Sequence, residues 1–77
     1  MDKKIILFGE VIGQLRRNRG ISQEDLAERA GVHRTYISQL ERGLKSPTLV
    51  VLMKLATALG MKASEILAQL EHELNEL

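Results

Sequence analysis

The sequence predicts an all-α domain of five short helices. Glycine, proline and capping residues divide the 77-residue chain into segments, and the apolar residues of these segments recur with helical spacing. No strand pattern competes with this one. The connections are short, without a linker, an internal repeat or a low-complexity stretch. Residues 1–77 are therefore expected to form a single bundle-like domain.

The first helix is expected over residues 5 to about 18. Phe8, Ile12 and Leu15 recur at i, i+4 and i+7, which places them on one helical face. The "NRG" that follows ends the helix. Its start is less well defined, because "KKIILF" could extend it toward the N-terminus.

The second helix is predicted to begin after Ser22. Ser22 and Asp25 have the spacing of a capping-box variant, in which each side chain accepts a hydrogen bond from the other residue's backbone N–H. Gly31 ends this helix, since glycine readily adopts the left-handed conformation of a helix end. Its inward face consists of Leu26, Ala27 and Ala30.

Three more helices are expected after Gly31. The third runs from about residue 33 to 42 and stops at Gly43, and the loop "KSPT" follows. Thr48 can cap a fourth helix that ends at Gly60. The apolar face of this fourth helix is predicted to consist of Leu49, Leu52, Leu55 and Ala56. The fifth helix is expected from about residue 63 to the C-terminus.

Charge is divided unevenly along the chain. The formal net charge is only +1, yet all eleven Lys and Arg lie before residue 63, where six acids leave a net charge of +5. Residues 63–77 hold four acids and no base, a net charge of −4. A basic body with an acidic end indicates two surfaces, one for an anionic partner and one for a protein. The alternative is an end that is acidic only for solubility.

The third helix has an outer face rich in side chains that can contact bases. Its inward positions are Val32, Ile37 and Leu40. The outer face is formed by the side chains at i, i+1, i+4, i+5 and i+8, namely Arg34, Thr35, Ser38, Gln39 and Arg42. Arginine can bind guanine through two hydrogen bonds, glutamine can bind adenine, and threonine can contact the thymine methyl. The alternative is an ordinary solvated surface, which more often carries Glu, Lys and Ala.

The spacing from Gln23 to Leu40 favours DNA contact, because it is the spacing of a helix-turn-helix. Small Ala27 lies where two helices must cross closely, and Gly31 lies where the turn needs a left-handed residue. The shared apolar seam is supplied by Leu26, Ala30, Val32, Ile37 and Leu40. Each signal is weak alone, but together they predict a helix-turn-helix.

The sequence resembles the phage repressor and Cro-type (Xre-type) helix-turn-helix proteins. The resemblance covers roughly residues 8 to 68 and is carried by "ISQEDLAERAGVHRTYISQLERG", "SPTL" and "LATALG". It implies the five-helix repressor domain, with residues 33–42 as the recognition helix. It also implies base contacts from Arg34, Thr35 and Gln39, with Ser38 beside them.

The same resemblance implies contacts to DNA phosphates, which position a protein without carrying sequence information. Gln23 falls where family members contact a phosphate from the first turn of the second helix. The loop that similar proteins lay along the DNA backbone is surrounded by Arg42, Lys45, Ser46 and Thr48. Tyr36 can donate its hydroxyl to a phosphate, although core packing alone would also explain it.

Two positions depart from the family pattern, and one pair agrees with it. His33 stands where Ser, Thr or Asp usually caps the recognition helix, so either the cap is weaker or the imidazole reaches a phosphate. Lys62 stands where a capping serine is common, which makes Ser64 an alternative start of the last helix. The resemblance pairs Arg16 with Glu41 in a charge-assisted bond that braces the recognition helix, from which Arg16 could still extend toward a phosphate.

The last helix is predicted to join two copies of the chain. Its apolar stripe continues beyond the point where a minimal domain covers its own core, and consists of Ile66, Leu67, Leu70, Leu74 and Leu77. A single recognition helix also contacts too few bases for useful specificity. The alternative is that Ile66 and Leu70 close the core of the monomer while the end of the helix frays.

The leading function is therefore a homodimeric, sequence-specific regulator of transcription that binds double-stranded DNA. Restriction-modification controller proteins are most similar in size and in "HRTYIS", with a minimal prophage repressor and an antitoxin-like or adaptor module as alternatives. No nucleophile–base pair or phosphate-binding glycine loop indicates an enzyme. No cofactor, small-molecule ligand or metal is expected, since the two histidines are isolated and there is no cysteine. Without a signal peptide or membrane span, the protein is expected in the cytoplasm.

Overall fold

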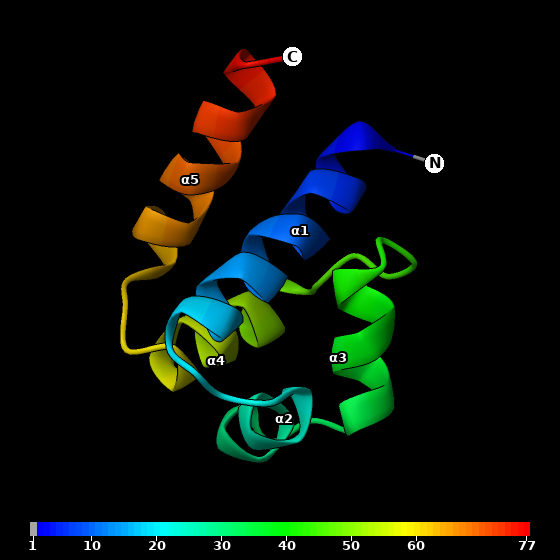
Figure 1. Cartoon of the computed structure of the whole chain (residues 1–77), viewed down its shortest axis with the longest axis vertical. Helices are drawn as coiled ribbons and strands as arrows, with labels where there is room; N and C mark the ends of the chain where they lie inside the picture. The colour runs from blue at the N-terminus through cyan, green and yellow to red at the C-terminus, as the bar shows by residue number, and fades with distance from the viewer. Residues whose placement is uncertain (1) are drawn as a thin grey trace.

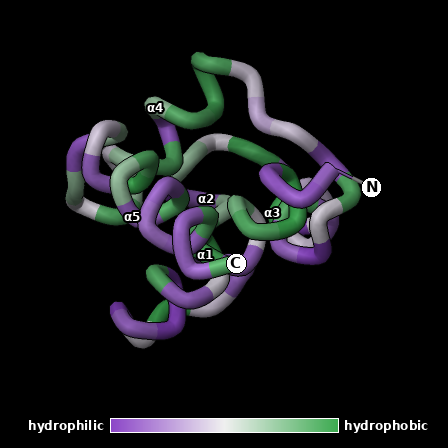
Figure 2. The backbone as a smooth tube through the Cα atoms, turned by 90° about the horizontal axis from the view of Figure 1, so that it is seen from above, coloured by the Kyte–Doolittle hydropathy of each residue, from purple (hydrophilic) through white to green (hydrophobic). Residues whose placement is uncertain are grey.

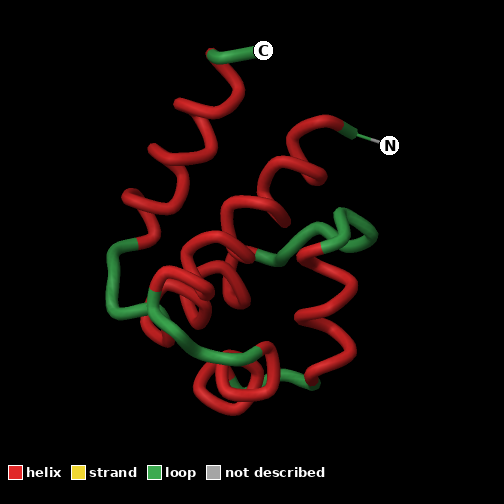
Figure 3. The backbone as a smooth tube through the Cα atoms, in the orientation of Figure 1, coloured by secondary structure: helices red, strands yellow, loops and turns green. Residues whose placement is uncertain are grey.

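Two longer helices lie side by side along the long axis of the molecule, and three shorter helices pack at one end (Figure 1). The structure is a computed structural model that describes residues 2–77. The longer helices are α1 (Lys3–Asn18) and α5 (Ala63–Asn75), and the shorter ones are α2 (Gln23–Ala30), α3 (Arg34–Glu41) and α4 (Leu49–Ala58). Only helices and loops occur in this part of the chain (Figure 3). The predicted all-α, five-helix fold is confirmed.

The predicted caps form as expected. The Ser22 hydroxyl accepts the Asp25 N–H at 3.0 Å, and the Asp25 carboxylate accepts the Ser22 N–H at 3.2 Å. Gly31 ends α2 with a φ of 68°. The Thr48 hydroxyl accepts the Val51 N–H at 3.2 Å and opens α4. Local capping chemistry therefore fixes three helix ends that lie around the predicted DNA-binding motif.

One helix begins earlier than the sequence indicated, and another begins where it was expected. α1 starts at Lys3 because the Asp2 carboxylate accepts the Lys4 N–H at 2.7 Å, so "KKIILF" is helical. α5 starts at Ala63, and the Ser64 alternative is wrong. Lys62 is the N-cap, and its backbone N–H donates to the Glu65 carboxylate at 2.8 Å.

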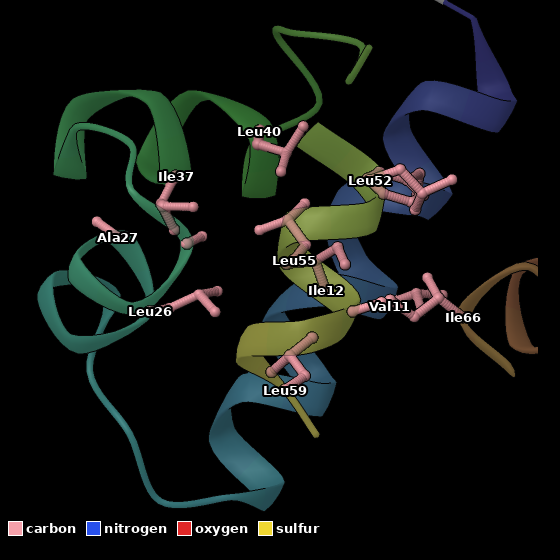
Figure 4. Close-up of a cluster of buried hydrophobic side chains, with 13 residues drawn as sticks. Val11, Ile12, Leu26, Ala27, Ile37, Leu40, Leu52, Leu55, Leu59 and Ile66 are labelled. Atoms are coloured by element: carbon pink, nitrogen blue, oxygen red, sulfur yellow. The ribbon is translucent and has the colours of Figure 1, made fainter. Parts of the chain in front are cut away.

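All five helices contribute to one apolar core (Figure 4). Leu26 and Leu40 close the seam between α2 and α3, and Leu55 of α4 packs beneath them. Leu49 was expected on the buried face of α4 but is 73% exposed. Leu49 is the first residue of α4 and lies at the edge of the core. The apolar repeat of the helix therefore extends beyond the residues that the core covers.

Ile66 also differs from its predicted role. It was expected in a dimer interface, but it is 0% exposed and points into the core beside Val11 (Figure 4). Leu70 is half-buried and packs against the same core. Both residues therefore pack within one copy of the chain. The assignment of Ile66 to a dimer interface is wrong.

Candidate nucleic-acid interface

α2 and α3 form the two helices of a helix-turn-helix. The turn between them passes through Gly31, in the left-handed conformation, and Val32, which is half-buried against the core. On the seam, Ala27 is buried with Ile37 and Leu40 of α3. The small Ala27 side chain allows the close crossing that the sequence predicted. The exposed side of α3 is therefore held at a fixed angle to α2.

The four predicted base-contacting residues lie together on α3. Arg34 and Thr35, in its first turn, are exposed, and Ser38 and Gln39, one turn later, are half-exposed. His33 precedes them as the N-cap, with an extended backbone and no capping hydrogen bond from its side chain. The first turn of α3 therefore has backbone N–H groups that no side chain of its cap satisfies.

A cluster of polar side chains holds the C-terminal end of α3. Arg16 Nε donates to Glu41 Oε2 at 2.7 Å and Arg16 Nη2 donates to Glu41 Oε1 at 3.1 Å. The Gln23 amide donates to the same Glu41 Oε1 at 3.0 Å, and Arg16 Nη1 donates to the Ile21 carbonyl at 2.9 Å. Arg16, Gln23 and Glu41 come from three helices, α1, α2 and α3. We name the three side chains Arg16, Gln23 and Glu41 the Glu41 cluster.

The Glu41 cluster is largely shielded from water. The side chains of Arg16 and Glu41 are only 12% and 9% exposed. The hydrogen bond to Glu41 raises the pKa of the Arg16 guanidinium above its ordinary value, so Arg16 stays charged at any physiological pH. The predicted Arg16–Glu41 pair is confirmed by the geometry. Arg16 donates to both Glu41 and the Ile21 carbonyl, so its side chain is folded against the protein rather than extended into solvent.

The predicted phosphate-contacting residues follow α3 or border it. Arg42, Lys45, Ser46 and Thr48 are all exposed, in and around the loop between α3 and α4. The Arg42 guanidinium donates back to the Ser38 carbonyl at 3.3 Å. Gln23 lies at the start of α2, but the Glu41 cluster uses its amide N–H. Its backbone N–H lies in the first turn of α2, where no acceptor within the helix is available.

Tyr36 has a divided environment. It is half-buried and packs against the core, and this burial raises the pKa of its phenol above the ordinary value. The hydroxyl therefore stays protonated and can donate a hydrogen bond at neutral pH. Tyr36 lies in the first turns of α3, close to the exposed Arg34 and Thr35 in the helix.

Sequence reasoning missed the glycines that bring α1 against α3. A Cβ atom at Gly9 would lie 2.2 Å from the Leu40 carbonyl oxygen, so only glycine allows the two backbones to approach this closely. A Cβ at Gly13 would lie 3.3 Å from the Glu41 carboxylate. The signal was the spacing of two glycines in "GEVIG", four residues apart on one face of a predicted helix.

Neither a metal site nor a membrane helix is found among residues 2–77. No three His, Asp or Glu side chains in this range come together in a way that could bind a metal ion. None of the described helices combines the length and apolar character needed to cross a bilayer.

The chain belongs to the helix-turn-helix family, whose sequence pattern matches residues 12–66. It is 42% identical over 69 residues to the control protein C.SmaI of Serratia marcescens, across 90% of this chain and 81% of that one. It is 40% identical over 63 residues to the control protein C.BamHI of Bacillus amyloliquefaciens, across 80% of this chain and 78% of that one. The predicted resemblance to small restriction-modification controller proteins is confirmed, and the family is one of DNA-binding transcriptional regulators rather than enzymes.

A solved controller protein has the same fold over its whole length. The restriction-modification controller protein C.Esp1396I superposes with a TM-score of 0.92 over 100% of both chains, at 27% identity. One chain of C.Esp1396I, from the structure of its tetramer in complex with its natural 35 base-pair operator, superposes with a TM-score of 0.88, at 29% identity over 95% of this chain and 96% of that one. The fold that carries the α3 face is thus the fold of a protein seen on its operator.

Proposed function

We propose that this chain is a controller protein that regulates transcription as a homodimer on a pseudo-palindromic operator. The proposal rests chiefly on the outer face of α3, where Arg34, Thr35, Ser38 and Gln39 project from a helix whose far end the Glu41 cluster fixes. Side chains that recognise base edges need such a rigid support, because hydrogen-bond geometry decides which base is accepted. The controller relatives support the regulatory role.

Two groups of residues divide the work of binding. Arg34, Thr35, Ser38 and Gln39 contact base edges in the major groove. Phosphates are contacted by Gln23, His33, Tyr36, Arg42, Lys45, Ser46 and Thr48, which surround that face on α2, α3 and the loop after it. The uncapped first turn of α3 supports a further contact, since free backbone N–H groups at a helix start bind anions. The two groups differ in what they determine, sequence preference for the first and overall affinity for the second.

A homodimer follows from the size of the α3 face. One recognition helix contacts a few base pairs, whereas two copies related by a two-fold axis contact two half-sites about one DNA turn apart. The last helix was predicted to join the copies. With Ile66 in the core and Leu70 half-buried, that prediction now depends on Leu67, Leu74 and Leu77, of which Leu67 is 40% exposed and Leu77 69% exposed.

The regulatory role makes the chain a binding protein rather than an enzyme. This is supported by the family itself and by the α3 surface, which holds hydrogen-bonding groups but no paired nucleophile and base. The protein acts in the cytoplasm, where the DNA of a bacterial controller system lies.

Selection from a pool of random DNA duplexes tests the proposal. Wild-type protein should enrich an inverted repeat whose half-sites are centred about 34 Å apart, one helical turn. The enriched duplex should bind at least about a thousandfold more tightly than unselected DNA at the same salt concentration. Recovery of sequences with no common motif would contradict a sequence-specific role.

A further inference from the structure

The first four helices end in turns of the same kind. In each turn a left-handed glycine donates its backbone N–H to a carbonyl of the last helical turn, and the next residue donates its N–H to an earlier carbonyl. This next residue is apolar in all four turns. The four pairs are Gly20–Ile21, Gly31–Val32, Gly43–Leu44 and Gly60–Met61.

Leu44, which follows α3, differs from the other three apolar residues. Those three are half-buried and pack against the core, whereas Leu44 is 50% exposed and is not part of this packing. The apolar residue of such a turn usually contacts an apolar side chain near the end of its own helix. On α3 the positions for that contact hold Gln39 and Ser38, which are polar. The Leu44 side chain therefore lacks the apolar partner that its turn normally provides.

The turn holds Leu44 in a fixed position. Its backbone N–H donates to the Gln39 carbonyl at 2.9 Å. Gly43 is buried with a φ of 75°, and a Cβ atom there would lie 3.0 Å from the Ile6 Cα atom. The start of the loop is therefore held between the end of α3 and the backbone of α1. Along α3, Leu44 lies beyond Gln39, at the end opposite to Arg34.

The charges around Leu44 favour DNA as its partner. Residues 42–48 include Arg42 and Lys45 and no acid, a net charge of +2. Figure 2 shows the loop that enters α4 in white and purple, ahead of the hydrophobic start of that helix. A two-fold axis brings each surface against itself, so two copies of this basic segment would repel each other there. DNA neutralises these charges, and its major groove also offers an apolar group, the 5-methyl group of thymine.

We propose that Leu44 contacts the 5-methyl group of a thymine at one edge of each half-site. This rests on the proposed function, and it adds an apolar contact to a face made mainly of hydrogen-bonding side chains. The order of residues along α3 predicts which base pair is involved. Gln39 lies between Arg34 and Leu44, so the thymine lies next to the base pair that Gln39 contacts, on the side away from that of Arg34.

Deoxyuridine tests the contact, because it pairs as thymidine does and differs only by the missing methyl group. The operator is the sequence that wild-type protein enriches from random duplexes, and a second duplex carries uracil at this thymine in each half-site. Wild-type protein should bind the uracil duplex about fourfold more weakly per half-site, which corresponds to one buried methyl group. Leu44→Ala should bind the two duplexes equally, because its shorter side chain does not reach the methyl group.

Two further variants separate the methyl contact from other roles of the loop. Leu44→Met keeps an apolar side chain of similar volume and should retain the preference for thymine over uracil. Lys45→Ala removes a charge assigned to a phosphate. It should weaken binding to both duplexes by the same factor, so that their ratio stays that of wild type. Circular dichroism verifies that the Leu44 variants fold, and the comparison made with wild type needs no variant.

Three results would overturn the role of Leu44. These are a wild-type motif without thymine next to the position that Gln39→Ala ceases to select, equal binding of wild type to both duplexes, and a Leu44→Ala variant as sensitive to uracil as wild type. If the third result came with weaker association of the subunits in sedimentation, Leu44 would belong to a protein contact instead. Failure of the proposed function is distinguishable, because the wild type would then enrich no common motif.

Discussion

Glu41 is the residue on which the position of the recognition helix depends most. Its carboxylate accepts three hydrogen bonds, two from Arg16 and one from Gln23, at a site that is largely buried. Glu41→Gln keeps the shape but removes the charge, and turns an acceptor into a donor that faces Arg16. We expect the free energy of unfolding to fall by about 2 kcal/mol, because an unpaired buried arginine remains. Urea denaturation measures this loss, and Arg16→Met/Glu41→Gln should recover part of it. A single variant as stable as wild type would show that the cluster does not brace the fold.

Gly9 and Gly13 lie on the same side of α1 but should respond in opposite ways to alanine. Alanine is favoured over glycine in a helix by about 1 kcal/mol. At Gly13 the nearest atom belongs to the flexible end of the exposed Arg17, and the Glu41 carboxylate lies 3.3 Å away, so Gly13→Ala needs only small side-chain shifts and should leave stability unchanged or raise it. At Gly9 the nearest atom is a backbone oxygen 2.2 Å away, so Gly9→Ala should lower stability by about 2 kcal/mol despite the gain in propensity. Thermal melts of the two variants check this, and equal shifts would refute the close contact between α1 and α3.

At the scale of the elements, α2 is sensitive to acid through its capping box. The hydrogen bond from the Ser22 backbone lowers the pKa of the Asp25 carboxyl below its ordinary value. The stabilisation is therefore complete above the pKa of the unfolded chain, about 3.9, and is lost as the pH falls through the lower pKa of the folded state. We expect Asp25→Asn to be less stable than wild type at pH 7 and to approach it near pH 2. Melting temperatures at the two pH values measure this, and a constant difference would contradict it.

Helix ends were predictable because they depend on residues close in sequence. Ser22 with Asp25, Gly31 and Thr48 each act within four residues, and all three caps formed. Burial was less predictable, since it depends on where distant helices end. The helical repeat correctly grouped Leu52 and Leu55, but it could not show that the core stops before Leu49. The same limit explains Ile66, whose partners on α1 lie more than fifty residues away in the chain.

The candidate site, too, was predictable from the sequence only in part. The outer face of α3 followed from the period of the helix alone, and Arg34, Thr35, Ser38 and Gln39 lie together as predicted. The Arg16–Glu41 pair came from family resemblance. The bond from Gln23 to Glu41 could not be foreseen, because it depends on the angle at which α2 crosses α3.

At the scale of the whole molecule, binding should combine one sequence-dependent surface with a surrounding electrostatic one. Lys45 is exposed in the loop after α3 and is assigned to a phosphate. Lys45→Ala should weaken binding to selected and unselected DNA by the same factor, and should lower the slope of log K against log salt by about one unit per subunit bound. Titrations at several salt concentrations measure the slope. An unchanged slope would remove Lys45 from the interface.

The central claim is that the outer face of α3 determines which DNA sequence is bound, and paired selections from random duplexes test it most directly. Arg34→Ala and Gln39→Ala are each compared with wild type and with Arg17→Ala, an exposed arginine of α1 that lies outside the face. Each α3 variant should lose preference at one base position of each half-site and bind the wild-type operator about 1 to 3 kcal/mol more weakly. Arg17→Ala should retain the full motif. If both α3 variants enriched the same complete motif as wild type, the face of α3 would not be the sequence-determining surface.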